Sequence, residues 1–168
     1  ALDCVITNSI LVEHFAITDR ALTDSEHQRI RPEDRVLHFL PPIFDGALEE
    51  ILPAWVGGAA VVVHPDPRGD TPRGWVARCE HQRITVSVLP VGFFHELADE
   101  VARNEVALPD SLRLLVLGGE SPHPAKVAAV LAAGGGRLTI TNAYGPTETV
   151  IAATRHDVTL AEAESGRA

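Results

Sequence analysis

Short runs of aliphatic and β-branched residues alternate along the chain with longer stretches in which apolar residues recur every three or four positions. The short runs predict strands, and the longer stretches predict amphipathic helices. The predicted strands cover residues 4–7, 35–40, 59–64, 84–89, 112–117, 137–141 and 150–158. The predicted helices cover residues 9–23, 44–56, 71–82, 93–104 and 124–133.

This alternation predicts an α/β fold in which a mostly parallel sheet carries helices on both faces. No internal repeat or linker interrupts it, so residues 1–168 are interpreted as a single unit. In such sheets ligands bind beyond the carboxyl ends of the strands. Stretches rich in Gly, Pro and polar residues follow the predicted strand ends, at 41–45, 90–92, 118–121 and 142–148. The small, polar tail 161–168 is expected to fray.

Local signals refine two of the helices. Thr71 is predicted to cap the helix 71–82, with Pro72 at its first helical position. In the helix 44–56, Pro53 should cause a kink or an early end. The apolar residues of that helix fall on one face at helical spacing: Phe44, Ala47, Leu48, Ile51, Leu52 and Trp55.

Composition narrows the function classes. The formal charge of −9 argues against a nucleic-acid-binding protein. No apolar run approaches the roughly 18 residues of a membrane span, and the first residues do not resemble a signal peptide. Cys4 and Cys79 fit neither a disulfide framework nor a zinc site. These features predict a cytoplasmic protein, and the absence of methionine indicates a piece of a longer one.

The most specific chemical signal is the string NAYGPTE at residues 142–148. Tyr144 offers a flat ring on which a base can stack. Gly145 allows close approach to the backbone, and Pro146 stiffens the turn. Thr147 supplies a hydroxyl group for phosphate oxygens, and Glu148 a carboxylate suited to magnesium. The alternative is a strand-ending turn with an exposed acid.

This string is similar to a core motif of the adenylation domains of nonribosomal peptide synthetases, which are adenylate-forming enzymes. Phe44–Asp45, a helix and the stretch 57–63 resemble the FD-helix-GA-strand segment of that family. LGGES at 117–121 resembles its GGE segment, and ITVSVLP at 84–90 resembles its buried strand that ends in LP. The resemblance covers residues 4–158 and implies the central, flavodoxin-like subdomain.

The resemblance implies a reaction in two parts. An amino acid and ATP give aminoacyl-AMP and pyrophosphate, and the acyl group then passes to the phosphopantetheine thiol of a peptidyl carrier protein. The implied cofactors are ATP and Mg²⁺, with Glu148 as the magnesium ligand. Tyr144 would lie against the adenine, and Thr147 would contact phosphate. The full implied nucleotide-binding set is Gly119, Glu120, Asn142, Tyr144, Gly145 and Thr147.

Several parts of the family's pattern are missing from this sequence. The Gly-rich phosphate loop, the downstream ribose-binding aspartate and the C-terminal lid with its catalytic lysine are absent, and Asn8 stands where many relatives have a histidine. Phosphoryl-type transfer depends on such positioning and charge neutralisation. The chain alone is therefore expected to lack adenylation activity, to hold no catalytic residue and to need the remainder of the adenylation domain. A subdomain without its neighbours is also expected to be marginally stable or to self-associate.

The resemblance also implies a substrate pocket. Asp45 would bind the α-ammonium group of the amino acid, although an acid there could instead cap the helix. Glu49 lies on the same helix face as Asp45, one turn on, and an acid in this pocket suggests a cationic side chain such as that of lysine or ornithine. A solvated acidic face with Glu50 is the alternative. The remaining implied pocket residues are Gly46, Val88, Val116, Gly118, Ala143, Ile151 and Ala152.

Three other functions remain open at this point. An aryl- or fatty-acyl-activating ligase of the same superfamily would not need the acid at Asp45, because its substrates carry no α-ammonium group. A non-catalytic binding module or engineered subdomain would account for the missing loop and lid. A flavodoxin-like signalling domain has less support, because nothing resembles its acidic phosphorylation pocket.

Overall fold

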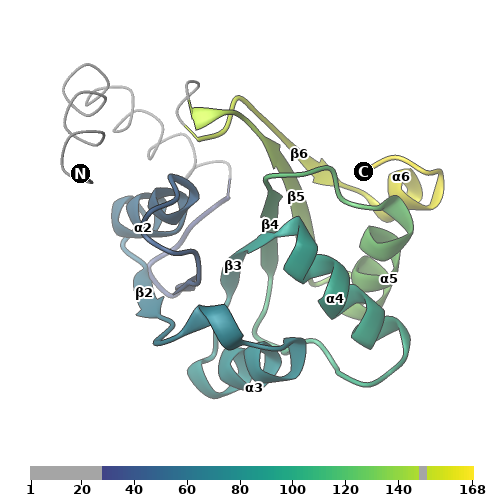
Figure 1. The fold of residues 1–168 in the computed structure, drawn as a ribbon, viewed down its shortest axis with the longest axis horizontal. Helices are drawn as coiled ribbons and strands as arrows, with labels where there is room; N and C mark the ends of the chain where they lie inside the picture. The colour runs from purple at the N-terminus through teal and green to yellow at the C-terminus, as the bar shows by residue number, and fades with distance from the viewer. Residues whose placement is uncertain (1–27, 148–150) are drawn as a thin grey trace.

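The computed structural model describes residues 28–147 and 151–168, which form one six-stranded sheet with the strand order β2-β1-β3-β4-β5-β6 (Figure 1). The strands are β1 (Arg35–His38), β2 (Ala60–Val63), β3 (Val86–Pro90), β4 (Leu114–Gly118), β5 (Thr139–Tyr144) and β6 (Thr154–Val158). All neighbouring strands are parallel except β5 and β6, which are antiparallel. The predicted mostly parallel α/β fold is confirmed. The strand and helix predicted at 4–7 and 9–23 lie outside the described residues.

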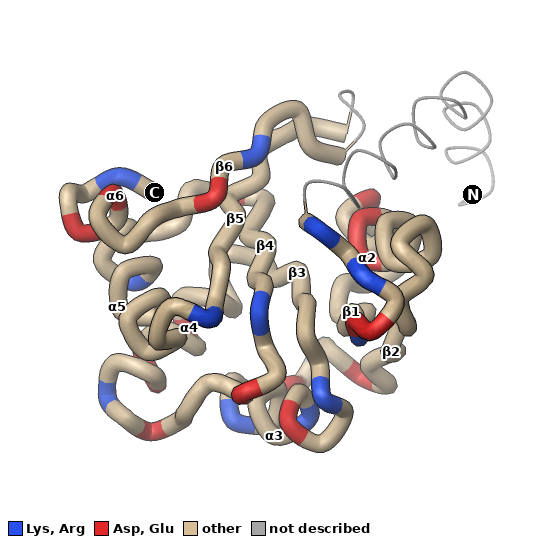
Figure 2. The backbone as a smooth tube through the Cα atoms, turned by 180° about the vertical axis from the view of Figure 1, so that it is seen from behind, with Lys and Arg blue, Asp and Glu red and all other residues tan. Residues whose placement is uncertain are grey.

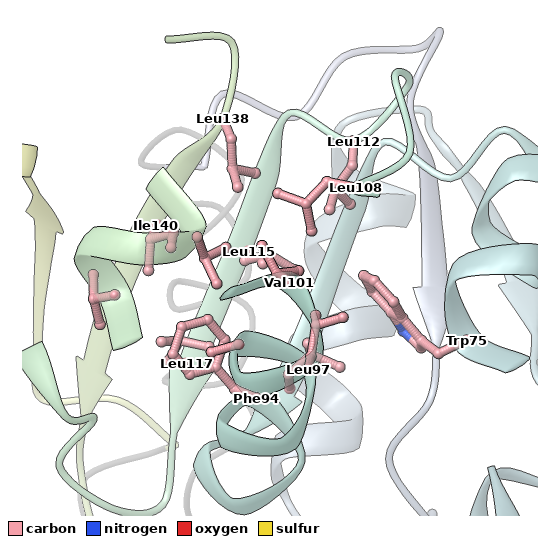
Figure 3. Close-up of a cluster of buried hydrophobic side chains, with 14 of the residues drawn as sticks. Trp75, Phe94, Leu97, Val101, Leu108, Leu112, Leu115, Leu117, Leu138 and Ile140 are labelled. Carbon is pink, nitrogen blue, oxygen red and sulfur yellow. The ribbon is translucent and has the colours of Figure 1, made fainter. Parts of the chain in front are cut away.

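Helices cover both faces of the sheet, but unequally. The helices are α2 (Gly46–Val56), α3 (Pro72–Gln82), α4 (Val91–Ala102), α5 (Pro124–Gly134) and the short α6 (Leu160–Glu164), with a 3₁₀ turn at Pro67–Gly69. The larger core lies between the sheet and the helices α3, α4 and α5, around Trp75, Phe94 and Leu117 (Figure 3). A smaller core on the other face, which includes Val36, Val88 and Val116, contacts α2 through Ala54.

The orientation of α2 differs from what its periodicity indicates. Its buried positions are Ala47, Glu49, Glu50, Pro53 and Ala54. Of the predicted apolar stripe only Ala47 is buried, whereas Leu48 is exposed and Phe44 and Trp55 are 57% and 66% exposed. Small residues let the helix lie close to the sheet, and Glu50 reaches the end of β1, so tertiary contacts decide which face is buried. The helix begins at Gly46 rather than at residue 44 and continues through Pro53 to Val56.

Three other boundaries carry information. The Thr71 hydroxyl accepts a hydrogen bond from the Gly74 amide at 3.2 Å, and helix α3 begins at Pro72, as predicted. Strand β5 extends to Tyr144, so the first part of the NAYGPTE string is strand and not turn. The expectation that residues 161–168 fray is wrong. Residues 161–164 belong to α6, whose N-terminus has a capping box between Thr159 and Glu162 and whose Ala163 is buried, and the amides of residues 165–167 hydrogen-bond back to this helix.

Candidate functional site

The carboxyl ends of the parallel strands surround a cavity of about 340 Å³. Strand β3 ends at Pro90 and β4 at Gly118, and α2 begins beside them with Asp45 and Gly46. This is where ligands bind in open parallel sheets. The cavity is lined by these predicted substrate residues: Asp45, Gly46, Glu49, Val88, Gly118, Ala143 and Ile151.

Two of the predicted pocket residues do not reach this cavity. Val116 and Ala152 are almost fully buried in the smaller core under α2. Val116 lies in the interior of β4, paired with Thr141, so its side chain packs within the protein. Ordinary core packing, the alternative that residue type alone also allows, describes both positions.

A second hollow of about 480 Å³ adjoins the first. It is lined by most of the predicted nucleotide-binding residues: Gly119, Glu120, Asn142, Tyr144 and Gly145. Gly119, Ala143 and Gly145 contribute to both hollows, so the two share a wall. Thr147 is exposed and lines neither hollow, and Glu148 lies outside the described residues.

Tyr144 is the exposed aromatic residue of the second hollow. It is the last residue of β5, and its side chain is 71% exposed. An aromatic ring in this position offers a face on which a nucleobase can stack, because stacking needs an accessible π-surface.

Asp45 occupies the N-cap position of α2 without acting as a side-chain cap. Its side chain makes no capping hydrogen bond, and its backbone carbonyl accepts a bond from the Leu48 amide at 2.9 Å. The half-buried carboxylate therefore borders the cavity at the positive end of the helix dipole, which stabilises a negative charge. This leaves the carboxylate available to a cation inside the cavity.

Glu49 lies one turn further along α2 and forms an ion pair within the chain. Its Oε1 is 2.5 Å from Nη1 of Arg155 on β6, and the two side chains are only 6% and 5% exposed. Figure 2 shows the acidic positions of α2 in red and a basic position on β6 in blue. A buried carboxylate needs a partner, and here the protein itself supplies one. Arg155 is thus a cationic partner of Glu49 within the protein.

Glu50 is buried as well, and it ties α2 to the end of β1. Its carboxyl oxygens accept hydrogen bonds from the amides of Phe39 at 3.1 Å and Leu40 at 3.2 Å, and Oε2 lies 2.7 Å from Nδ1 of His38. Burial raises the pKa of Glu50 to about 9, against the opposing effect of the two amide donors. The alternative, a solvated acidic face of Glu49 with Glu50, is wrong, because both side chains are buried.

The backbone around the cavity is unusual at two positions. A Cβ atom on Gly145 would lie 2.5 Å from the Ala153 amide nitrogen and 2.6 Å from the Cα of Ala152, so only glycine fits between these strands. Gly145 is thus required by the close approach of the segment that leads into β6. Ile151, which lines the cavity, has a φ of 72°. A β-branched residue in the left-handed region is strained by about 1–3 kcal/mol.

Several lining residues were not identified from the sequence. Leu40, Pro41, Phe44, Leu89 and Pro90 also line the first cavity. All of them lie in or next to the stretches that follow predicted strand ends. The rule that ligands bind beyond the carboxyl ends of parallel strands therefore pointed to this part of the chain. The residues around Arg155 did not indicate its ion pair, because its partner Glu49 is distant in the sequence.

The arrangement combines an acid at a helix N-terminus, an aliphatic slot and, across a shared wall, an aromatic platform. The acid can bind an ammonium group, the slot can hold a side chain and the platform can hold a base. Within residues 28–147 and 151–168, no three His, Cys, Asp or Glu side chains gather as metal ligands would. In the same described part, no helix is both long and apolar enough to cross a membrane.

Comparison with known families decides which class of protein this is. The sequence model of the family described as "AMP-binding enzyme" matches residues 9–167. The chain belongs to the AMP-binding enzyme family. Within this family it corresponds to part of an adenylation domain, as its relatives among the nonribosomal peptide synthetases show.

Three sequence relatives illustrate the family membership. The chain is 37% identical over 131 residues to the isonitrile lipopeptide synthase of Streptomyces coeruleorubidus, covering 76% of this chain and 9% of that protein. It is 33% identical over 144 residues to the nonribosomal peptide synthetase ivoA of Emericella nidulans, covering 85% and 8%. It is 39% identical over 128 residues to novobiocin biosynthesis protein H of Streptomyces niveus, covering 75% and 19%.

Two solved structures have the same fold over most of this chain. PA1221, a nonribosomal peptide synthetase protein with adenylation and PCP domains, superposes with a TM-score of 0.70 at 27% identity, covering 80% of this chain and 22% of that chain. CmiS6 superposes with a TM-score of 0.68 at 30% identity, covering 83% and 33%. The chain thus spans about a third or less of the length of these relatives.

Proposed function

We propose that this chain is the amino-acid recognition part of an adenylation domain. The domain would convert an amino acid and ATP to aminoacyl-AMP and pyrophosphate and would then load the thiol of a carrier protein. The observation that carries this proposal is the position of Asp45. Its carboxylate borders a cavity that shares a wall with the hollow bordered by Tyr144, so an ammonium site and a base-stacking site lie side by side.

In the proposed reaction, Asp45 holds the α-ammonium group and so orients the carboxylate of the substrate toward the shared wall. A carboxylate oxygen attacks the α-phosphorus of ATP, and the bond from this phosphorus to its bridging oxygen breaks. Pyrophosphate leaves with the electron pair. The carrier thiol then attacks the acyl carbon and displaces AMP. The contribution of this chain is positioning, which can supply a large part of the rate enhancement of such reactions.

The nucleotide would occupy the second hollow. Tyr144 would stack on the adenine, and Gly119, Glu120, Asn142 and Gly145 would surround it. Thr147 is proposed to contact phosphate from its exposed position beside this hollow. Glu148 is proposed as the ligand of Mg²⁺, which neutralises phosphate charge when bound. In the proposed reaction the residues of the described part, 28–147 and 151–168, act by positioning and not as acid, base or nucleophile, and we propose that the 168 residues alone are inactive.

The remainder of an adenylation domain is the proposed partner of the outward face of α2. The exposed apolar residues of this helix are Leu48, Trp55 and Val56, and Ile43 and Phe44 just before the helix are exposed as well. Isolated apolar side chains on a surface are normal, but a contiguous group marks an interface. Relatives several times longer than this chain have further protein with which such a surface can be covered.

An acyl- or aryl-activating ligase is the closest alternative. The aliphatic walls of the cavity would suit such substrates. An acyl- or aryl-activating ligase would also use adenylate formation, so membership of the AMP-binding family does not separate the two functions. The Asp45 carboxylate favours an amino acid, because a substrate without an ammonium group would leave this acid without a cation.

The test places residues 8–158 of this chain in an intact adenylation domain, in place of the matching segment. ATP–pyrophosphate exchange is then measured over the proteinogenic amino acids and ornithine, after circular dichroism has shown the graft to be folded. Exchange that depends on one amino acid or a small group supports the proposal. Exchange with carboxylic acids that lack the amine would favour the acyl-activating alternative. A folded graft without any exchange would favour a binding module.

A further inference from the structure

We propose that Arg155 determines the substrate class of the amino-acid pocket: by neutralising Glu49, it makes the pocket select a neutral side chain and reject a cationic one. This inference rests on the proposed function. It replaces the expectation, drawn from the sequence, that Glu49 binds a basic side chain such as that of lysine or ornithine.

The position of Arg155 follows from the pairing of β5 and β6. Arg155 lies opposite Ala143 in this antiparallel pair. Side chains that are directly opposite in an antiparallel pair stand on the same face of the sheet. Ala143 belongs to the smaller core on the α2 face, so the side chain of Arg155 also stands on that face. From there it reaches Glu49 at 2.5 Å.

The two members of this pair stand in different relations to the cavity. Glu49 is among the residues that line it, whereas Arg155 is not. A substrate side chain would therefore meet the carboxylate of Glu49 with the guanidinium group behind it. Both side chains are more than nine-tenths buried, so water screens their charges little.

A cationic substrate side chain would face two unfavourable effects here. It would lie close to the like charge of Arg155, and it would have to share a carboxylate that is already paired. A neutral side chain avoids both effects and can pack against the aliphatic walls formed by Val88, Ala143 and Ile151. We therefore expect a neutral amino acid as the substrate.

The test measures charge selectivity and not activity alone. In the graft described above, kcat/KM is determined for the preferred neutral amino acid, for lysine and ornithine, and for glutamate. Arg155→Gln removes the positive charge paired with Glu49, so we expect the ratio of kcat/KM for lysine or ornithine over the neutral amino acid to rise at least tenfold. Glu49→Gln removes the negative charge paired with Arg155, so we expect the ratio for glutamate over the neutral amino acid to rise.

Two further variants separate charge from general damage. The double variant Glu49→Gln, Arg155→Gln should return to the selectivity of the unchanged pocket, and Arg155→Lys should keep it. Arg113→Gln is the matched control, because Arg113 forms a similar pair with the buried Asp34 away from the cavity. This control should lower stability without changing any ratio. If Arg155→Gln does not fold, the selectivity ratios of Glu49→Gln and Arg155→Lys still test the inference.

The outcomes separate this inference from the proposed function. An unchanged graft that prefers lysine or ornithine overturns the inference and leaves the proposed function intact. Equal losses for all substrates in Arg155→Gln, as in Arg113→Gln, also overturn it. A folded graft that exchanges with no amino acid at all overturns the proposed function, and the inference with it.

Discussion

The carboxyl group of Glu50 lies 2.7 Å from Nδ1 of His38, and both side chains are held at the point where β1 leads into the cavity-lining loop. The same carboxyl group accepts hydrogen bonds from the amides of Phe39 and Leu40. Glu50 thus fixes the chain just before Pro41 and Asp45, on which the proposed ammonium site depends.

Burial raises the pKa of Glu50 to about 9, so the folded protein keeps a proton that the unfolded chain releases above pH 4.5. The unfolded state then binds fewer protons, and the free energy of unfolding falls as pH rises toward 9, by at most about 1.4 kcal/mol per pH unit. Burial lowers the pKa of His38, so the titration of His38 changes the free energy of unfolding only at more acidic pH. Urea unfolding of the chain at pH 7, 7.5 and 8 measures this slope below the range in which Cys79, whose pKa burial also raises, contributes.

Glu50→Gln should flatten the slope, because glutamine keeps the shape and hydrogen-bonding groups but carries no titratable proton. Glu33→Gln, at an exposed position, is the control and should retain the slope of the unchanged chain. A slope that persists in Glu50→Gln would show that another group releases the proton.

Asp45→Asn tests the ammonium site. A hydrogen bond to a charged group contributes about 1.5–3 kcal/mol, so kcat/KM for the amino acid in the graft should fall about ten- to a hundredfold. The effect should appear mainly in KM for the amino acid, with KM for ATP little changed. The control is a substrate analogue without the α-amine, whose poor kcat/KM should not fall further. Equal losses for both substrates would assign Asp45 a structural role at the start of α2.

Tyr144→Ala tests the base platform. Removal of a stacking aromatic costs about 1–3 kcal/mol per base, so KM for ATP should rise about 5- to 150-fold. Tyr144→Phe keeps the ring and should retain most of the affinity. Because Tyr144 is largely exposed, the free energy of unfolding should change by less than about 0.5 kcal/mol in both variants. An unchanged KM for ATP in Tyr144→Ala would place the base elsewhere.

Much of the fold and of the cavity could be predicted from local signals. The cap at Thr71 and the strand-end stretches depend on residues close in sequence, and the structure has both. The capping box of Thr159 and Glu162 was equally readable, with its T-x-x-E spacing, although the tail composition suggested fraying. The buried face of α2 and the partner of Glu49 were not predictable in this way. Both depend on contacts between segments that only the folded chain brings together. A helical period shows which side chains share one face of a helix, but it does not show which face packs against the sheet.

Trp55→Gln tests the outward apolar face of α2. In the isolated chain this face is exposed, with Trp55 at 66%, so we expect the unchanged chain to self-associate at micromolar concentration. Trp55→Gln should raise the monomer fraction in light scattering, with a change in the free energy of unfolding of less than about 0.5 kcal/mol. In the graft, where we propose that the remainder of an adenylation domain covers this face, the same substitution should destabilise by about 1.5–3 kcal/mol. Leu160→Gln, at an exposed position on α6, is the control and should leave association unchanged. Two results would contradict the assignment of this face to the partner. One is that the unchanged chain is monomeric, and the other is that Trp55→Gln lowers the free energy of unfolding equally in the chain and in the graft.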